Sequence, residues 1–211
     1  MTSAPMSGRK AQAARNDELI LQAARAVFTA DPGAPIAAVA EKAGVGISAL
    51  YRRYPSKEAL LQKLCGDGLK LYIEITERAL AEEGDAWEAF AGYLRGIVDG
   101  DTHSLTINLA GTFTPTEELG RDAARASALA TAIHRRAVGA GVLRPDVTVV
   151  DIALLFEQMA SIKLGDEERT AQLRHRYLAL VMDSLRVPPA HRELPGPPPV
   201  DEELSARWHP S

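Results

Sequence analysis

Two short helical segments separated by glycines constrain the fold more than any other part of this sequence. Apolar residues recur at helical spacing over residues 36–43, the run Gly44-Val45-Gly46 then interrupts the helix, and residues 47–54 resume the spacing before Pro55. Two helices of about eight residues joined by a Gly-containing turn have the dimensions of a helix-turn-helix. We therefore expect a compact N-terminal bundle built around this pair.

The same pattern separates a packing face from an outer face. A preceding apolar helix over residues 20–28 ends at Asp31-Pro32-Gly33 and completes a three-helix bundle. A recognition helix is narrow enough to enter the major groove of DNA, where residues near its N-terminus meet base edges. The expected packing residues are Val39, Ala40, Ala43, Val45 and Leu50, and the expected outer residues are Gly46, Ser48, Ala49, Arg52 and Arg53.

Helical spacing continues through the rest of the chain, and no segment shows the sustained alternation of a strand. The predicted fold class is therefore all-α. Ser56 and Asp85 are suitable N-caps, and Thr114 is predicted to open a capping box with Pro115 as the first helical residue. The expected helices beyond the N-terminal bundle cover residues 56–83, 85–98, 101–110, 114–138, 148–162 and 166–186.

Six prolines between Pro188 and Pro199 mark a change of composition, and this tail should be extended or disordered rather than helical. A solvated tail and a Pro-rich ligand for a partner domain both fit the composition, and Trp208 is apolar enough to dock on the body. We divide the chain into a flexible basic arm (1–15), a helix-turn-helix domain (16–63), a helical body (64–187) and the Pro-rich tail (188–211).

Charge is distributed unevenly along the chain. The formal net charge is −4, but residues 1–63 hold nine basic and five acidic side chains, so the remainder carries −8. A basic N-terminal module on an acidic body is typical of a DNA-reading domain joined to a domain that does not touch DNA. No apolar run approaches the ~20 residues that span a bilayer, and no signal-peptide core is present, so we expect a cytoplasmic protein without a membrane partner.

The single cysteine, Cys65, excludes an internal disulfide framework and a cysteine-clustered zinc site. Because it lies among leucines, we expect a buried, unreactive thiol. Phosphate loops, HExxH and nucleophile-elbow motifs are absent from the sequence, and the histidines do not cluster with carboxylates at ligand spacing. We therefore predict no metal, no cofactor and no catalytic residues.

The residues from Asn16 to Lys63 form a specific pattern. It comprises an apolar helix ending in Phe28, then Gly33, Val39-Ala40, Ala43-Gly44-Val45, Leu50-Tyr51, Tyr54 and Ser56-Lys57-Glu58-Ala59-Leu60. This pattern resembles the DNA-binding domain of the tetracycline-repressor (TetR) family of bacterial transcription regulators. The resemblance departs from the family at two places: Ala34-Pro35 replaces the usual capping hydroxyl of the second helix, and Gly46 replaces that of the recognition helix.

The resemblance implies a role for each matching position. Ser48 and Ala49 fall where base edges are read, and Arg52 can make a bidentate contact to guanine. Tyr51 falls where a hydroxyl meets phosphate while the ring packs inward, and Lys57 and Arg53 fall at phosphate contacts. The implied DNA-binding set is Gly46, Ser48, Ala49, Tyr51, Arg52, Arg53 and Lys57.

For the body, the resemblance implies a homodimer that binds a palindromic DNA operator, acts as a repressor and is released by a small-molecule effector. The last two helices are expected to pair with their copies in a four-helix bundle. The expected dimer interface is Ile152, Leu155, Leu173, Tyr177, Leu180 and Val181, and the expected effector contacts are Trp87, Phe90, Tyr93, Leu94, Leu105, Asn108, Phe113, Phe156 and Met159.

Two other classes of protein compete with this interpretation. One is an all-helical enzyme, and the other is a small-molecule-binding protein without sequence-specific DNA binding. Loss of operator binding on changing Arg52 to alanine, with folding and ligand binding retained, separates a regulator from both.

Overall fold

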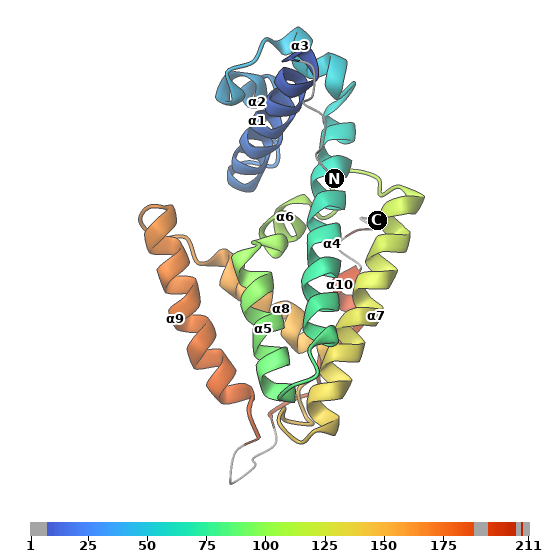
Figure 1. The fold of residues 1–211 in the computed structure, drawn as a ribbon, viewed down its shortest axis with the longest axis vertical. Helices are drawn as coiled ribbons and strands as arrows, with labels where there is room; N and C mark the ends of the chain where they lie inside the picture. Colours follow the sequence, from blue (N-terminus) through green and yellow to red (C-terminus); the bar gives the residue numbers. More distant parts are fainter. Residues whose placement is uncertain (1–7, 188–193, 206–207, 209–211) are drawn as a thin grey trace.

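The computed structural model describes residues 8–187, 194–205 and 208, and it shows a small helical domain attached to a longer helical body (Figure 1). The described residues contain no strand, and their one β-bridge joins Leu143 to Arg186. The predicted all-α architecture is therefore confirmed, with the N-terminal helix-turn-helix followed by the helical body.

The small domain consists of α1 (Gly8–Ala30), α2 (Ile36–Ala43) and α3 (Ile47–Arg53). Their apolar faces meet in one core, in which Phe28, Val39 and Leu50 are fully buried. Ala43 and Val45 pack against this core as partly buried residues, so the predicted packing face is confirmed.

α1 is longer than the sequence pattern suggested. The expected flexible arm over residues 1–15 is wrong from Gly8 onward, because residues 8–15 are already helical; residues 1–7 lie outside the described part. This first stretch contains three alanines, which favour helix. Side chains also support it: Gln12 Nε2 donates to Asn16 Oδ1 at 2.8 Å and Arg15 donates to Gln12 Oε1 at 3.0 Å.

α4 (Lys57–Ala81) connects the small domain to the body. Ser56 caps it as predicted, and its hydroxyl accepts from the Ala59 N–H at 3.0 Å. The first turns of α4 place Leu60, Leu61 and Leu64 in the core of the small domain. That core also contains residues from the body: Leu105, Leu109, Phe113 and Leu119. No gap in packing therefore separates the two parts near residue 63.

The body is formed by α5 (Ala86–Asp99), α6 (Thr102–Leu109), α7 (Glu117–Gly139), α8 (Val149–Ser161) and α9 (Glu167–Leu185). Asp85 caps α5 by accepting from the N–H groups of Trp87 and Glu88. The predicted start of α7 is corrected: Thr116, rather than Thr114, is the N-cap, so Pro115 precedes the helix. Thr116 prevails because its hydroxyl reaches the Leu119 N–H at 3.2 Å.

The body has a second core, centred on Phe90, Ile97, Ile133 and Leu143, which joins α5 to α7, α8 and α9. Beyond it, residues 194–200 have no regular structure, but α10 (Asp201–Ser205) adds a short helical turn to the tail. The prediction of a tail without helix is therefore wrong at α10, which follows the last proline of the run and begins with three acidic residues that favour a helix N-terminus.

Two glycines of α5 differ in what surrounds them, and this difference gives a test of the packing between α4 and α5. A Cβ added at Gly96 would lie 2.7 Å from Ile75 Cγ2, whereas a Cβ added at Gly92 would meet nothing within 4 Å. Gly92→Ala should raise the free energy of unfolding by about 0.5–1 kcal/mol through helix propensity, and Gly96→Ala should lower it by about 1 kcal/mol or more through overpacking. Urea unfolding followed by circular dichroism measures both. Equal stabilisation by the two substitutions would contradict the close approach of these helices.

Candidate functional site

The turn between α2 and α3 adopts a conformation that its glycines permit. Gly44 caps α2 with a φ of 66°, in the left-handed region that glycine occupies without strain. Its N–H donates to Glu41 O at 3.1 Å, and the Val45 N–H donates to Ala40 O at 3.0 Å. These bonds satisfy carbonyls at the end of α2, so the turn holds α3 at a defined angle across it.

The outer face of α3 is accessible to a partner. Gly46, Ser48, Tyr51 and Arg52 are exposed, while Ala49 is half-buried. Tyr51 is 46% exposed, so it packs inward less than the family resemblance implied. A polar, exposed face with one arginine and one tyrosine hydroxyl matches the chemistry of base edges and phosphates.

Arg53 has a partner within the protein. Its guanidinium makes a bidentate ion pair with Asp17 of α1, with Nε–Oδ1 at 2.6 Å and Nη2–Oδ2 at 2.8 Å. The Tyr54 hydroxyl donates to the same carboxylate at 2.7 Å. These hydrogen bonds, that of Arg53 above all, lower the pKa of Asp17, while burial and the carboxylate raise the pKa of Tyr54. The guanidinium predicted to contact phosphate is therefore engaged in fixing α3 on α1.

Lys57 is also held within the domain. Its Nζ donates to the carbonyls of Pro32 at 2.7 Å and Ala34 at 2.8 Å, and lies 5.0 Å from the centre of the Phe28 ring. An ammonium has three donors, so two of them here secure the loop between α1 and α2. Asp17 was not among the residues predicted from the sequence. The available signal was an acidic residue on the first helix together with the two arginines, Arg52 and Arg53, at the end of the third.

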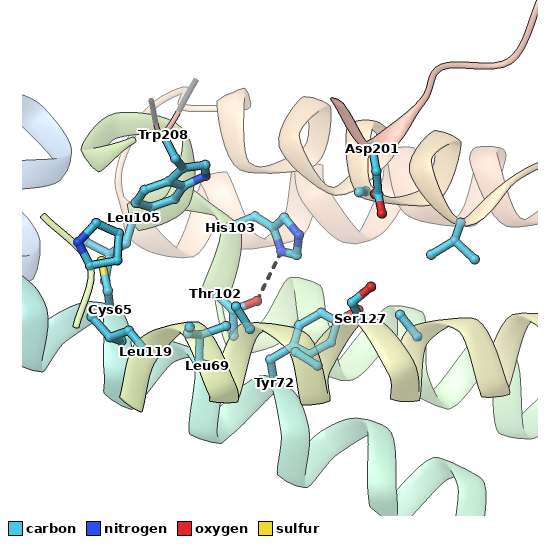
Figure 2. A pocket seen from close by; sticks show the side chains of 18 of the residues that line it. Cys65, Leu69, Tyr72, Thr102, His103, Leu105, Leu119, Ser127, Asp201 and Trp208 are labelled. Atoms are coloured by element: carbon cyan, nitrogen blue, oxygen red, sulfur yellow. Dashed lines mark hydrogen bonds between the residues drawn. The ribbon is translucent and has the colours of Figure 1, made fainter. Parts of the chain in front are cut away.

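A cavity of about 500 Å³ lies in the body, a size typical of small-molecule sites. Its walls come from α4, α5, α6, α7 and α8, with α10 and Trp208 contributing from the tail (Figure 2). Most of the lining is apolar. The residues on α4 are Leu64, Cys65, Gly68, Leu69 and Tyr72, and those on α7 are Leu119, Gly120, Ala123, Ala126, Ser127 and Ala130.

The predicted effector contacts divide between this cavity and the core. Tyr93, Leu105 and Phe113 line the cavity. The other predicted aromatic and aliphatic residues do not: Trp87, Phe90 and Leu94 belong to the core of the body, and Phe156 and Met159 border a small separate recess. α5 is responsible for this error, because most of its apolar residues face its neighbours rather than an open space. The side chain of Asn108 lies outside the described part.

The sequence reasoning missed the walls from α4 and α7. Cys65, Gly68, Leu69 and Tyr72 follow one another at helical spacing, as do the small residues Ala123, Ala126, Ser127 and Ala130. A stripe of small residues on a long helix leaves space that a neighbour must fill, and this was the available signal. Cys65 is half-buried rather than buried as predicted, because one side of it faces the cavity, and burial still raises the pKa of its thiol to about 12.

His103 is the main polar group of the cavity. Its Nδ1 lies 3.2 Å from Thr102 Oγ1, and its ring contacts the tilted ring of Phe156 with a centroid distance of 4.9 Å. Burial lowers its pKa to about 4, against the opposing effect of the carboxylates of Glu157 and Asp101, so the ring is neutral at pH 7. The hydroxyls of Tyr72 and Tyr93 meet at 2.6 Å on the same side of the body.

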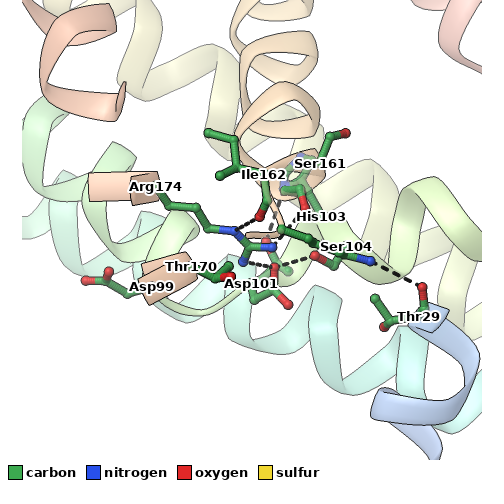
Figure 3. Close-up of polar contacts among 12 residues, drawn as sticks. Thr29, Asp99, Asp101, His103, Ser104, Ser161, Ile162, Thr170 and Arg174 are labelled. Carbon is green, nitrogen blue, oxygen red and sulfur yellow. Dashed lines mark hydrogen bonds and ion pairs between the residues drawn. The ribbon is translucent and has the colours of Figure 1, made fainter. Parts of the chain in front are cut away.

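Asp101, directly before α6, connects the body to α1 (Figure 3). Its carboxylate accepts from Arg174 of α9 at 2.7 Å and from the Ser104 hydroxyl, while its carbonyl accepts from Arg25 of α1 at 3.1 Å. A second link runs from Lys163 Nζ to the carbonyl of Thr29 at 3.3 Å. Residues beside the cavity are thus connected by hydrogen bonds to the domain that carries α3.

The predicted dimer residues also divide into two groups. Ile152 and Leu173 are buried within their own chain, which is inconsistent with their expected contact to a partner, and Leu155 and Val181 are half-buried. Their burial follows from the inward stripe of α9, which is Leu173, Leu178, Met182 and Leu185 rather than the predicted set. Tyr177 and Leu180, at 48% and 58% exposed, form an outward apolar pair on the same helix.

Among the described residues, no helix has the length and apolarity to cross a bilayer, and no group of three His, Cys, Asp or Glu side chains is arranged to hold a metal ion.

His103 gives a pH-dependent test of the cavity wall. In the unfolded chain a histidine takes up a proton near about pH 6.5, whereas His103 does so only near about 4 in the folded chain. The unfolded state therefore binds more protons between these values, and the free energy of unfolding should fall as the pH is lowered through this window, by up to about 1.4 kcal/mol per pKa unit. Urea unfolding at several pH values should show a smaller fall for His103→Gln. An identical fall in both proteins would place His103 in water rather than in the wall.

The chain was compared with known proteins. Residues 20–64 match the model of the family described as bacterial regulatory proteins, tetR family. The search of curated proteins found no match. A TetR transcription regulatory protein from Mycobacterium vanbaalenii is 27% identical, with a TM-score of 0.55 over 84% of this chain and 99% of that one. The TetR regulator SCO0520 from Streptomyces coelicolor is 26% identical, with a TM-score of 0.56 over 82% and 99%.

A third similar structure, the TetR-like regulator LfrR from Mycobacterium smegmatis in complex with proflavine, shares the fold at 23% identity, with a TM-score of 0.56 over 78% of this chain and 94% of that one. The matched segment spans the helices that form the N-terminal core here, and the similar structures extend over nearly their whole length. Residues 20–64 therefore form a domain of the tetR family of bacterial regulatory proteins, and together with the shared fold this supports a DNA-binding transcriptional regulator of the TetR family.

Proposed function

We propose that this regulator binds a palindromic operator as a homodimer and is a repressor released by a small-molecule effector held in the cavity. One helix, α4, connects the DNA-binding domain to the cavity. α4 begins at Lys57 beneath the helix-turn-helix and lines the cavity from Leu64 to Tyr72. The solved complex of the Mycobacterium smegmatis regulator with proflavine supports a small molecule as the effector.

For DNA contact we propose the outer face of α3, with Arg52 as the main base-reading residue. Arg52 is exposed on the last turn of α3, and Ser48 and Ala49 precede it nearer the N-terminus of the helix, where recognition helices meet base edges. Gly46 and the Tyr51 hydroxyl complete this face as backbone contacts. Arg53 and Lys57 contribute to DNA contact indirectly. The ion pair of Arg53 with Asp17 holds α3, and the hydrogen bonds of Lys57 hold the loop between α1 and α2.

For the dimer we propose that α8 and α9 pair with their copies, with Tyr177 and Leu180 at the centre of the contact. Both side chains are large, apolar and exposed in the single chain, and Val181 and Leu155 beside them are half-buried. A two-fold axis through this contact relates the two α3 helices of the dimer. To enter successive major grooves of the operator, these two helices must lie about 34–36 Å apart.

Release then follows from the geometry of α4. An occupant between α4 and α7 changes the preferred position of α4, and the N-terminal domain moves with it because Leu60, Leu61 and Leu64 of α4 belong to the core of that domain. To shift the dimer from mostly DNA-binding to mostly non-binding, the ligand must bind the non-binding conformation about 5.5 kcal/mol more tightly than the DNA-binding one. By linkage, the operator duplex should weaken ligand binding by the same factor as the ligand weakens operator binding.

The DNA-reading role of Arg52 can be tested directly. A duplex selected from a random pool by the purified protein should lose affinity for Arg52→Ala by about 1–3 kcal/mol, or roughly 5- to 150-fold. Fluorescence anisotropy with labelled duplex measures this loss, and the melting temperature should stay unchanged because the side chain is exposed. Arg121→Ala on α7, whose side chain is also exposed, is the matched control. Equal affinities for both variants, or no preference for any duplex over random competitor, would contradict sequence-specific binding through α3.

The dimer contact gives a second test. Leu180→Glu places a charge in the proposed apolar interface, so the protein should become monomeric and its operator affinity should fall at least about tenfold. Light scattering after size-exclusion chromatography reports the molecular mass. Leu19→Glu, at another exposed leucine position on α1, should leave the mass of the dimer unchanged. A dimer that persists in Leu180→Glu would place the interface elsewhere.

A further inference from the structure

The tail supplies part of the cavity wall. Asp201 of α10 and Trp208 both line the cavity, although they follow the Pro-rich run and lie beyond the last helix of the body. The Trp208 ring packs edge-on against Phe113, with a centroid distance of 6.0 Å and an interplanar angle of 83°. Figure 2 shows Trp208 and Asp201 on one side of the space, with Leu69 and Tyr72 of α4 on the other.

Two hydrogen bonds in the described part of this segment are exposed to solvent. The Leu194 N–H donates to Asp146 at 3.1 Å, and the Val200 N–H donates to Glu203 at 2.8 Å at the start of α10. α10 has only five residues, and its three acidic side chains are exposed. A helix this short is not stable by itself, so the packing of Trp208 on Phe113 contributes to its position.

The chemistry of the wall restricts the charge of an occupant. None of the described residues that line the cavity is Lys or Arg. His103 is neutral at pH 7 because burial lowers its pKa to about 4, and burial raises the pKa of Tyr72 to about 12, so that ring is neutral as well. An anion would therefore be buried without a partner, which is costly, and Asp201 at the edge would repel it.

We propose that α10 and Trp208 form a lid over the cavity, that Trp208 contacts the bound molecule, and that this molecule carries no negative charge and is largely apolar, with a hydrogen-bonding group that meets His103. The inference rests on the proposed role of the cavity as the effector site. It adds the class of ligand and assigns a binding role to the end of the chain. His103 and the Tyr72 and Tyr93 hydroxyls supply the polar contacts, while the other aromatic side chains and the alanines form the apolar surface that the ligand packs against.

Two related dyes provide the test. N-phenyl-1-naphthylamine is uncharged, and 8-anilino-1-naphthalenesulfonate has the same ring system with an added sulfonate. Titration of the full chain, followed by dye fluorescence, should show at least about tenfold tighter binding of the uncharged dye. Trp208→Ala should weaken its binding by at least about fivefold, because an aromatic contact and its buried area are lost. Trp208→Phe should restore most of the affinity.

The two tryptophans allow the contact itself to be observed. Trp87 is buried in the core of the body and does not line the cavity, so Trp87→Phe leaves Trp208 as the sole tryptophan. In that variant the uncharged dye should quench the Trp208 emission by energy transfer as it binds. Gly68→Phe is the control for the cavity, since a Cβ added at Gly68 meets nothing within 4 Å and the ring would fill the space between α4 and α7.

The outcomes separate the lid from the effector site. Loss of dye binding in Gly68→Phe together with weakened binding in Trp208→Ala supports the proposal. Loss in Gly68→Phe with unchanged binding in Trp208→Ala overturns the lid and leaves the effector site standing. Unchanged binding in both variants overturns the lid and the effector role together. Equal or tighter binding of the sulfonated dye overturns the exclusion of anionic ligands.

Discussion

α4 packs into two hydrophobic cores, and this packing fixes the N-terminal domain on the body. Leu60, Leu61 and Leu64 complete the core of the N-terminal domain, and further along the same helix Ile73 and Ala79 are buried in the body. Because interiors are close-packed, a helix shared in this way cannot shift at one end without a response at the other. The cavity lies at the junction of the two cores, with Leu64, Leu105 and Leu119 from one and Tyr93 from the other.

Polar contacts reinforce this mechanical link. Asp101 has a φ of 47°, a conformation that is uncommon for a residue with a side chain, and its hydrogen bonds to Arg25, Arg174 and Ser104 hold it there. It lies two residues before His103 of the cavity wall. A displacement of α6 would therefore reach α1 through Arg25 as well as through the packed leucines.

Charge in the N-terminal domain is used in two ways. Arg53 and Lys57 make bonds within the domain, to Asp17 and to the carbonyls of residues 32 and 34, and these bonds set the position of α3 and the loop before α2. Arg52 and Ser48 remain on the exposed face. This division is consistent with Gly46 and Ala34-Pro35, which lack the capping hydroxyls expected from the family resemblance: no side-chain cap bond is made at the start of α2 or α3.

The helical class, the helix-turn-helix and most helix boundaries could be predicted from the sequence, because these follow from local spacing, caps such as Ser56 and Asp85, and the left-handed turn at Gly44. The sequence also indicated the exposed face of α3. Three features became clear only from the packing of the folded chain: Arg53 pairs with Asp17, Ile152 and Leu173 are buried, and small residues of α7 and Trp208 enclose the cavity. Local patterns state which residues prefer to be buried. Which partner buries them, and where space is left, depends on the mutual placement of helices far apart in the chain.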